Sequence, residues 1–269
     1  MASTSREGLH VTWWFPLLAA PFAGSFLFVL IRRLPARRPV LWGRSRCESC
    51  GHRLGPLELM PIVSFLAQRG RCRACGAPVH VGHLAAELIA LLIAAAVAAT
   101  GAEGLKLWGG CALGWTLLAL AWIDWEEGVL PDALTLPLVV AGLALAWWLV
   151  PWTLTDRAVG AIVGYLGFRL LATLYRAFRE REGLGQGDAK LLAASGAWLG
   201  WQALGNVVLL AALLGLGCAV VARARGRTLG ATTALPFGPA LAVATFVLWL
   251  TQAVVERYEP HSLGQLMTG

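Results

Sequence analysis

Two aspartates, Asp124 and Asp188, stand at the ends of apolar segments, where an ionised side chain is costly and needs an explanation. Asp124 lies in Ala-Trp-Ile-Asp124-Trp, and Asp188 follows Gly183-Leu-Gly-Gln-Gly. Two carboxylates that meet at low dielectric titrate as a pair and share a proton. One can then act as a base toward water while the other acts as an acid toward a carbonyl, which is the arrangement of aspartic peptidases.

Other roles for the acidic residues remain open at this stage. Asp188 could equally cap the helix that it begins, because aspartate is favoured near helix starts. Asp132, which follows a proline, is favoured as an N-cap, and Glu126 and Glu127 as solvated interfacial charges. Lys190 could contact substrate or lower the pKa of Asp188, and the alternative is a lysine whose charged end reaches the interface.

The glycines before Asp188 do not form a nucleotide-binding motif. No β-strand precedes them, their spacing is Gly-x-Gly-x-Gly, and the Gly-Lys-Ser/Thr of a phosphate-binding loop is missing. We interpret Gly185 and Gly187 as giving the backbone room for a tight bend and for an extended substrate beside the carboxylate. His80 and His83 lack the His-Glu-x-x-His pattern of a catalytic zinc site.

Four cysteines form two CxxC pairs, Cys47/Cys50 and Cys72/Cys75, in one polar segment. This spacing predicts a tetrahedral Cys₄ zinc site, with a glycine after each pair to allow the tight turn. Four sulfur ligands leave no position for water or substrate, so the zinc would be structural. The alternative is two disulfides, which are rare in the cytoplasm.

The composition indicates a polytopic membrane protein. Of the 269 residues, 58% are hydrophobic and only 14% are charged, whereas soluble domains carry about 25% charged residues. A spanning helix needs about 20 mostly apolar residues. We predict an all-α bundle of about eight spans, at 11–33, 84–101, 104–123, 133–151, 157–175, 189–202, 204–222 and 236–256.

The organisation predicted from these spans is a first helix, 1–33, a soluble zinc loop, 34–83, a helical bundle, 84–256, and a short tail, 257–269. Ten of the 22 Lys and Arg residues lie between Arg32 and Arg73. The positive-inside rule therefore places the zinc loop in the cytoplasm and both termini outside. The net charge of +7 is thus explained by topology, and no nucleic-acid partner is expected.

Several motifs in order along the chain resemble bacterial type IV prepilin leader peptidases/N-methyltransferases. They are Gly24-Ser-Phe-Leu, the CxxC pairs, Ala-Glu87-Leu, Ile-Asp124-Trp-Glu-Glu-Gly-Val-Leu-Pro-Asp132, Gly-Leu-Gly-Gln-Gly-Asp188-Ala-Lys and Pro236-Phe-Gly-Pro. The resemblance implies a Gly-x-Gly-Asp membrane aspartic peptidase with Asp124 and Asp188 as the catalytic pair. Gly185, Gly187, Lys190, Asp132 and Glu87 are expected to be supporting or substrate-proximal residues.

The resemblance also implies the substrates, the location and a second activity. The substrates would be type IV prepilins and type II secretion pseudopilins, cleaved at the cytoplasmic face of the bacterial inner membrane after a glycine. The new N-terminal residue would then be methylated from S-adenosylmethionine.

Two segments depart from the family pattern: Phe28 replaces an asparagine, and Glu58-Leu-Met-Pro61 replaces Asp-Asn-x-Pro. They lie in the N-terminal motif and the loop, so a peptidase without methyltransferase activity is one alternative. An inactive zinc-bearing assembly scaffold is another, although neither aspartate is missing. A transporter would place its acidic residues near the bilayer centre.

Overall fold

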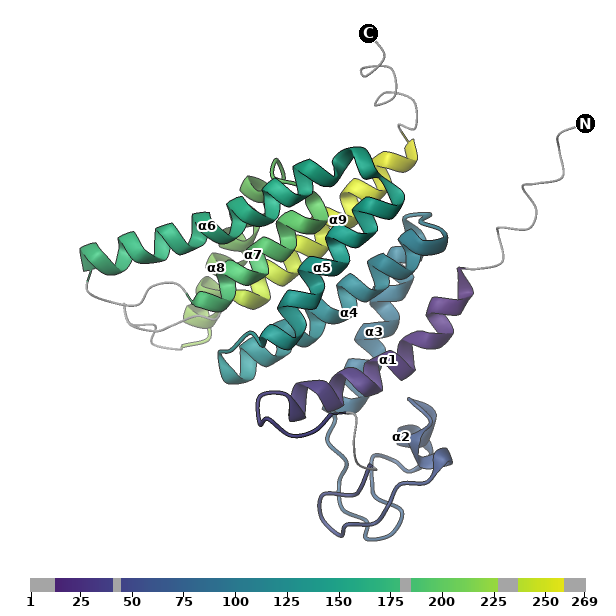
Figure 1. The fold of residues 1–269 in the computed structure, drawn as a ribbon. Helices are drawn as coiled ribbons and strands as arrows, with labels where there is room; N and C mark the ends of the chain where they lie inside the picture. The colour runs from purple at the N-terminus through teal and green to yellow at the C-terminus, as the bar shows by residue number, and fades with distance from the viewer. Residues whose placement is uncertain (1–12, 41–44, 180–184, 227–236, 259–269) are drawn as a thin grey trace, which may run out of the picture. The chain divides into compact units, whose positions relative to one another are not determined.

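The structure is a computed structural model that describes residues 13–40, 45–179, 185–226 and 237–258. Figure 1 shows the order of its elements. The α-helices are α1 (Trp14–Arg33), α2 (Val63–Ala67), α3 (Gly82–Ala99), α4 (Gly104–Glu127), α5 (Asp132–Leu149), α6 (Leu154–Arg179), α7 (Gln186–Leu199), α8 (Leu204–Ala224) and α9 (Gly238–Tyr258). Two short 3₁₀ helices, η1 (Pro56–Leu59) and η2 (Pro151–Thr153), complete them. The described residues form no β-strand, which confirms the all-α class.

Each of the eight predicted spans corresponds to a helix, and seven of the described helices are long and apolar enough to cross a membrane. The remaining predicted span, 189–202, the sixth in the sequence, corresponds to α7, which has 14 residues. At about 1.5 Å per residue, α7 is shorter than the hydrocarbon core of a bilayer is thick. Residues 11 and 12 of the first predicted span, residue 236 of the last, and 259–269 of the tail lie outside the described residues.

The chain divides into two compact units, Met1–Trp115 and Thr116–Gly269, which we call the N-terminal and C-terminal units. In the N-terminal unit, α1 packs on α3. A Cβ added to Gly24 of α1 would lie 2.5 Å from the Cα of Glu87, so the two backbones touch at this glycine. Small buried residues at every fourth position of α3, namely Ala86, Ala90 and Ala94, form its contact face. Small residues allow this close approach of helices within a membrane.

Helix α7 is the centre of the C-terminal unit, where it contacts α5, α6, α8 and α9. Eleven of its 14 residues are buried. Gly196 of α7 contacts Gly160 of α6 directly: a Cβ on Gly196 would lie 2.2 Å from the carbonyl oxygen of Gly160. Polar anchors also hold α7: Trp198 Nε1 donates to the Leu138 carbonyl at 2.8 Å, and the Ser195 and Thr245 hydroxyls lie 2.6 Å apart. The small residues of α7 thus allow close packing between helices. This explains why, among the predicted spans, its sequence is the least typical of a lipid-exposed helix.

The glycine contact predicts a position-specific loss of stability. Gly196→Ala should destabilise the protein by roughly 1–3 kcal/mol, because its methyl group has no space against the backbone of α6. Gly215→Ala on α8 is the matched control, since a Cβ there meets nothing within 4 Å. Thermal unfolding of the detergent-solubilised variants measures the difference, and equal unfolding temperatures would contradict the packing described here.

Candidate active site

Asp124 lies in the last turn of α4 and Asp188 in the first turn of α7, both within the C-terminal unit. Each residue is only 8% exposed. Burial raises the pKa of Asp188, which lies outside the seven candidate spans, to about 6. The neighbouring carboxylate of Asp124 is the second cause, and the N–H of Gly185 opposes both. The structure therefore brings the two aspartates close enough to interact, although 64 residues separate them in sequence.

Backbone N–H groups hold both carboxylates. The N–H of Gly185 donates to Asp188 Oδ2 at 3.3 Å, so Asp188 also caps the start of α7, as the sequence had left open. The N–H of Gly238, the first residue of α9, donates to the Asp124 carboxylate. A Cβ on Gly238 would lie 2.5 Å from Asp124 Oδ2, so only glycine fits at this contact.

Gly238 is a site residue that the analysis of individual residues did not select. Its signal was the Pro236-Phe-Gly-Pro motif, which contributed to the family resemblance without a role for its glycine. Pro236 itself lies outside the described residues. The N-terminal end of α9 directs its partial positive charge at Asp124.

Gly187 packs against the short connection between α4 and α5. A Cβ on Gly187 would lie 2.8 Å from the Cβ of Leu130, which is buried. This residue thus allows close contact between the start of α7 and the segment that follows Asp124. Gly185 is the N-cap of α7 and has φ of −68°, so it is not in the left-handed region. Gly183, the first glycine of the motif, lies outside the described residues.

The prediction that Asp132 is an N-cap is wrong. Pro131 occupies the N-cap position of α5, and Asp132 is the first helical residue with no capping hydrogen bond from its side chain. Its carboxylate instead accepts a hydrogen bond from Lys190 Nζ. The partly exposed pair links the start of α5 to α7 two residues after Asp188, so Lys190 has a specific partner.

The four cysteines of the N-terminal unit converge in the loop between α1 and α3. Their Sγ atoms all lie within 4.8 Å of one another, and Cys47 Sγ and Cys75 Sγ are 3.9 Å apart. Zinc–sulfur bonds of about 2.3 Å give a tetrahedral sulfur–sulfur separation of about 3.8 Å, whereas a disulfide would require about 2.05 Å. The cysteines are free thiols in the structure, and their donor set fits a Cys₄ metal site.

Matching turns present the two pairs of sulfurs. The N–H of Gly51 donates to the carbonyl of Cys47 at 2.9 Å, and the N–H of Gly76 donates to that of Cys72 at 2.8 Å. Both glycines have φ near +70°, which is the left-handed conformation that favours glycine. The backbone N–H groups of Cys50 and Ser49 also lower the pKa of Cys47 to about 6, which favours the thiolate that a metal requires.

Glu87 lies in the N-terminal unit with the cysteines, whereas the other predicted supporting residues lie near the aspartate pair in the C-terminal unit. Glu87 is 5% exposed, and its Oε2 accepts a hydrogen bond from the N–H of Ile62 at 2.7 Å. It also accepts one from the Ser25 side chain. Ile62 has φ of +61°, a strained conformation for a β-branched residue. The hydrogen bonds of Glu87 therefore connect a strained turn of the cysteine loop to α1 and α3.

Two family models match the chain, one in its N-terminal part and one after it. The bacterial peptidase A24 N-terminal domain matches residues 18–100, and the type IV leader peptidase family matches residues 111–220. The second match contains both aspartates, and the first contains the four cysteines.

The chain is also similar to proteins named prepilin leader peptidase/N-methyltransferase. It is 46% identical to that of Burkholderia pseudomallei (strain 1026b) over 212 residues, covering 78% of this chain and 67% of the relative. It is 39% identical to that of Aeromonas hydrophila over 257 residues, covering 84% and 87%. The Pseudomonas putida protein is 38% identical over 254 residues, covering 84% and 86%. No solved structure is a significant match.

The contact between Glu87 and Ile62 predicts a local change in dynamics. In Glu87→Leu, the Ile62 amide loses its acceptor, and its hydrogen exchange should become faster by roughly tenfold or more. Glu87→Gln keeps an acceptor oxygen and should restore most of the protection. Exchange measured by mass spectrometry on peptides that cover residues 60–66 tests this, with exposed Glu103→Gln as the control. If the Ile62 amide exchanges as slowly in Glu87→Leu as in the wild type, Glu87 does not stabilise this turn.

Proposed function

Because the chain belongs to the type IV leader peptidase family, we propose that it cleaves the leader from type IV prepilins or pseudopilins and methylates the new N-terminal residue. It is a membrane aspartic endopeptidase and an N-methyltransferase. The single observation that carries the peptidase assignment is the pair of buried aspartates, Asp124 and Asp188, which interact within the segment matched by the peptidase family.

The aspartate pair acts on the scissile peptide bond as one unit that carries a single proton. The ionised carboxylate takes a proton from water as the hydroxyl adds to the carbonyl carbon, and the protonated carboxyl donates its proton to the carbonyl oxygen. When the resulting tetrahedral adduct collapses, the C–N bond breaks and the leaving nitrogen receives a proton. Burial of both residues supports this sharing, because two ionised carboxylates at low dielectric repel each other.

The residues around the pair position it. The N–H groups of Gly238 and Gly185 orient the carboxylates of Asp124 and Asp188, respectively. Gly187, packed on Leu130, and the pair of Lys190 with Asp132 hold the start of α7 against the segment that follows α4. These are positioning roles, because each of these groups acts on a catalytic carboxylate or on a neighbouring helix.

The substrates are membrane-anchored prepilins whose short basic leader lies on the cytoplasmic side. The concentration of basic residues between Arg32 and Arg73 supports a multi-pass inner-membrane protein with its zinc loop in the cytoplasm. Both termini lie outside in the arrangement of eight crossings, in which the short helix α7 crosses while enclosed by other helices. In that orientation, Asp124, at the C-terminal end of α4, and Asp188, at the N-terminal end of α7, lie at the cytoplasmic face, where the leader is accessible. S-adenosylmethionine supplies the methyl group for the second reaction.

The aspartate pair predicts the behaviour of two isosteric variants. Asp124→Asn and Asp188→Asn should each reduce the rate of prepilin cleavage by roughly 10²–10⁴-fold, because neither variant can share a proton between two carboxylates. The assay is gel separation of precursor and mature pilin with purified enzyme. Glu127→Gln, an exposed acid three residues after Asp124, is the matched control and should process normally. Full processing of prepilin by either aspartate variant would contradict the assignment of Asp124 and Asp188 as the catalytic pair.

The second part of the proposal is that Cys47, Cys50, Cys72 and Cys75 hold one structural zinc ion. The sulfur separations support zinc over disulfides. The loop has few buried apolar residues, since Cys72 and Pro61 are its only buried residues among those described between 45 and 80. A metal centre can replace the missing hydrophobic core in such a segment.

Metal analysis tests this assignment. The purified protein should contain about one zinc per chain, and Cys47→Ser should lose it because three thiolates hold the ion far more weakly than four. Cys218→Ser, a change of the same kind on α8, should keep the metal. A metal-free protein whose loop thiols react only after reduction would show the disulfide alternative instead.

A further inference from the structure

One short segment of the cysteine loop exposes several large apolar side chains. They come from η1, α2 and the residues between them, and we call them the apolar ridge: Leu57, Leu59, Met60, Val63 and Leu66. All five are exposed, and Leu57 is 79% exposed. Scattered apolar side chains are common on protein surfaces, but a group of this size in one segment marks a contact surface. Neither the peptidase mechanism nor the cysteine cluster uses this surface.

The one charged side chain within this segment is turned inward. Glu58 is the only charged residue between 56 and 68, and its side chain is 10% exposed. Its Oε2 accepts a hydrogen bond from the N–H of Gly55 at 2.8 Å and lies 3.4 Å from His52 Nε2, and its Oε1 is buried without a hydrogen-bond partner. A segment that faces water places its charges outside and its leucines inside. The reverse arrangement here fits an apolar environment on the outer side of the segment.

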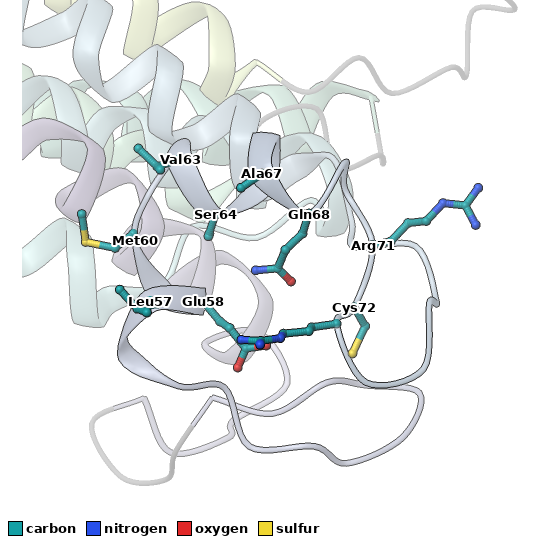
Figure 2. Close-up of a pocket in the computed structure, with 10 residues that line it drawn as sticks. Leu57, Glu58, Met60, Val63, Ser64, Ala67, Gln68, Arg71 and Cys72 are labelled. Carbon is teal, nitrogen blue, oxygen red and sulfur yellow. The ribbon is translucent and has the colours of Figure 1, made fainter.

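Basic residues border the apolar ridge. Figure 2 shows Leu57, Met60 and Val63 of the ridge along one side of a cavity of about 630 Å³, and Arg71 extends outward from its rim. Arg69 follows α2 directly, and both arginines are exposed. An apolar surface bordered by arginines is typical of a segment at the surface of an anionic bilayer, because the apolar side chains enter the acyl region and the guanidinium groups meet the phosphates.

A hydrogen bond holds the middle of the ridge beside the membrane helices. The N–H of Ile62 donates to Glu87 Oε2, and Glu87 lies within the candidate span α3, about 7.5 Å along the axis from its first residue, Gly82. Because helical side chains point back toward the N-terminus, Ile62 lies beside the first turns of α3. The backbone of Glu87 also contacts Gly24 of α1, about 13 Å before the basic end of that helix at Arg33. The loop therefore folds back along the two spans at this turn, so the bilayer begins next to the ridge.

We propose that the apolar ridge inserts into the bilayer leaflet next to the cysteine loop, with Arg69 and Arg71 at the phosphates of anionic phospholipids. The segment that the sequence analysis placed in a soluble loop is then an interfacial element of the membrane protein. It gives the cysteine loop a third attachment to the membrane, in addition to α1 and α3. The inference concerns a contact with lipid, and it holds for either orientation of the chain in the membrane.

Fluorescence quenching by brominated lipids tests the position of the ridge in the full chain. A fluorescent unnatural amino acid replaces Leu66 of the ridge, Ala74, an exposed residue of the second CxxC turn, or Leu92, an exposed residue within α3. Each protein is reconstituted into vesicles of phosphatidylcholine and phosphatidylglycerol that carry bromine near the headgroup end of the acyl chains. The labels at Leu66 and Leu92 should be quenched by roughly twofold or more, because both lie within the leaflet, and the label at Ala74 should not.

Aqueous iodide should give the opposite pattern, with quenching at Ala74 and protection at Leu66. A label at Leu57, the most exposed side chain of the ridge, repeats the measurement at a second position. A single symmetric peak in size-exclusion chromatography shows that each labelled protein is folded. Bromine quenching at Leu66 and Leu57 that is no greater than at Ala74 would overturn the inference.

The lipid preference of the same label tests the two arginines. Brominated phosphatidylglycerol and brominated phosphatidylcholine are compared at equal mole fraction with the label at Leu66. The anionic lipid should associate roughly threefold or more in excess, because each arginine at the surface attracts anionic headgroups. Arg69→Gln combined with Arg71→Gln should remove this preference, whereas Arg46→Gln combined with Arg53→Gln, an equal loss of charge at the first CxxC pair, should keep it. An unchanged preference in the Arg69 and Arg71 double variant would overturn the assignment of the headgroup contacts.

Two other occupants of the ridge would give different results. If a prepilin covers the ridge, iodide reaches the label at Leu66 in vesicles until prepilin is added. If a second copy of the chain covers it, protection from iodide increases with the number of chains per vesicle. Either result would overturn the lipid contact. The measurements require neither cleavage nor methyl transfer, so the failure of this inference and the failure of the proposed function are distinguishable.

Discussion

The cost of burying two carboxylates together is the constraint on which the C-terminal unit depends. Asp124 and Asp188 repel each other and lose hydration, so they stay adjacent only if the surrounding helices cannot move apart. The α7 helix meets this requirement, because its small residues bring it into backbone contact with α6 at Gly160 and Gly196. The short length of α7 fits the same role. A helix enclosed by its neighbours is stabilised by its contact area with them and not by its contact with lipid. The stability of the unit and the proximity of the two aspartates therefore depend on the same packing.

Glycine has different uses at neighbouring places in this unit. At Gly187 it allows contact with Leu130, and at Gly238 it leaves space for the Asp124 carboxylate and supplies a backbone donor. The common reason is steric: at each place a Cβ would occupy space that another group already fills. This differs from the cysteine turns, where Gly51 and Gly76 are needed for their positive φ and a Cβ would meet nothing.

The N-terminal unit solves a different physical problem. Its loop has too little buried apolar surface for a core, and its four sulfurs converge in a geometry that fits the proposed zinc ion. Glu87 adds a buried hydrogen bond to the strained turn at Ile62. Such a frame can keep large apolar side chains exposed while the Glu58 carboxylate lies inside. The two family models divide the chain between residues 100 and 111, close to the boundary of the two units.

The sequence by itself determined the membrane class, the approximate ends of the helices and the candidate residues of both sites. Those properties follow from composition, the length of apolar runs and short-range spacing, which are local. Only the tertiary structure decided which groups meet: Asp188 with the charge of Asp124, Asp124 with the N–H of Gly238, and Lys190 with Asp132, which local preference had assigned to a cap. It also showed that Glu87 serves the cysteine loop and that one oxygen of Glu58 has no partner. Most of these contacts join residues from 25 to more than 100 positions apart, and Glu58 Oε1 is buried by the fold of its loop. Helix packing and loop folding therefore determine these contacts, and they cannot be predicted from local periodicity.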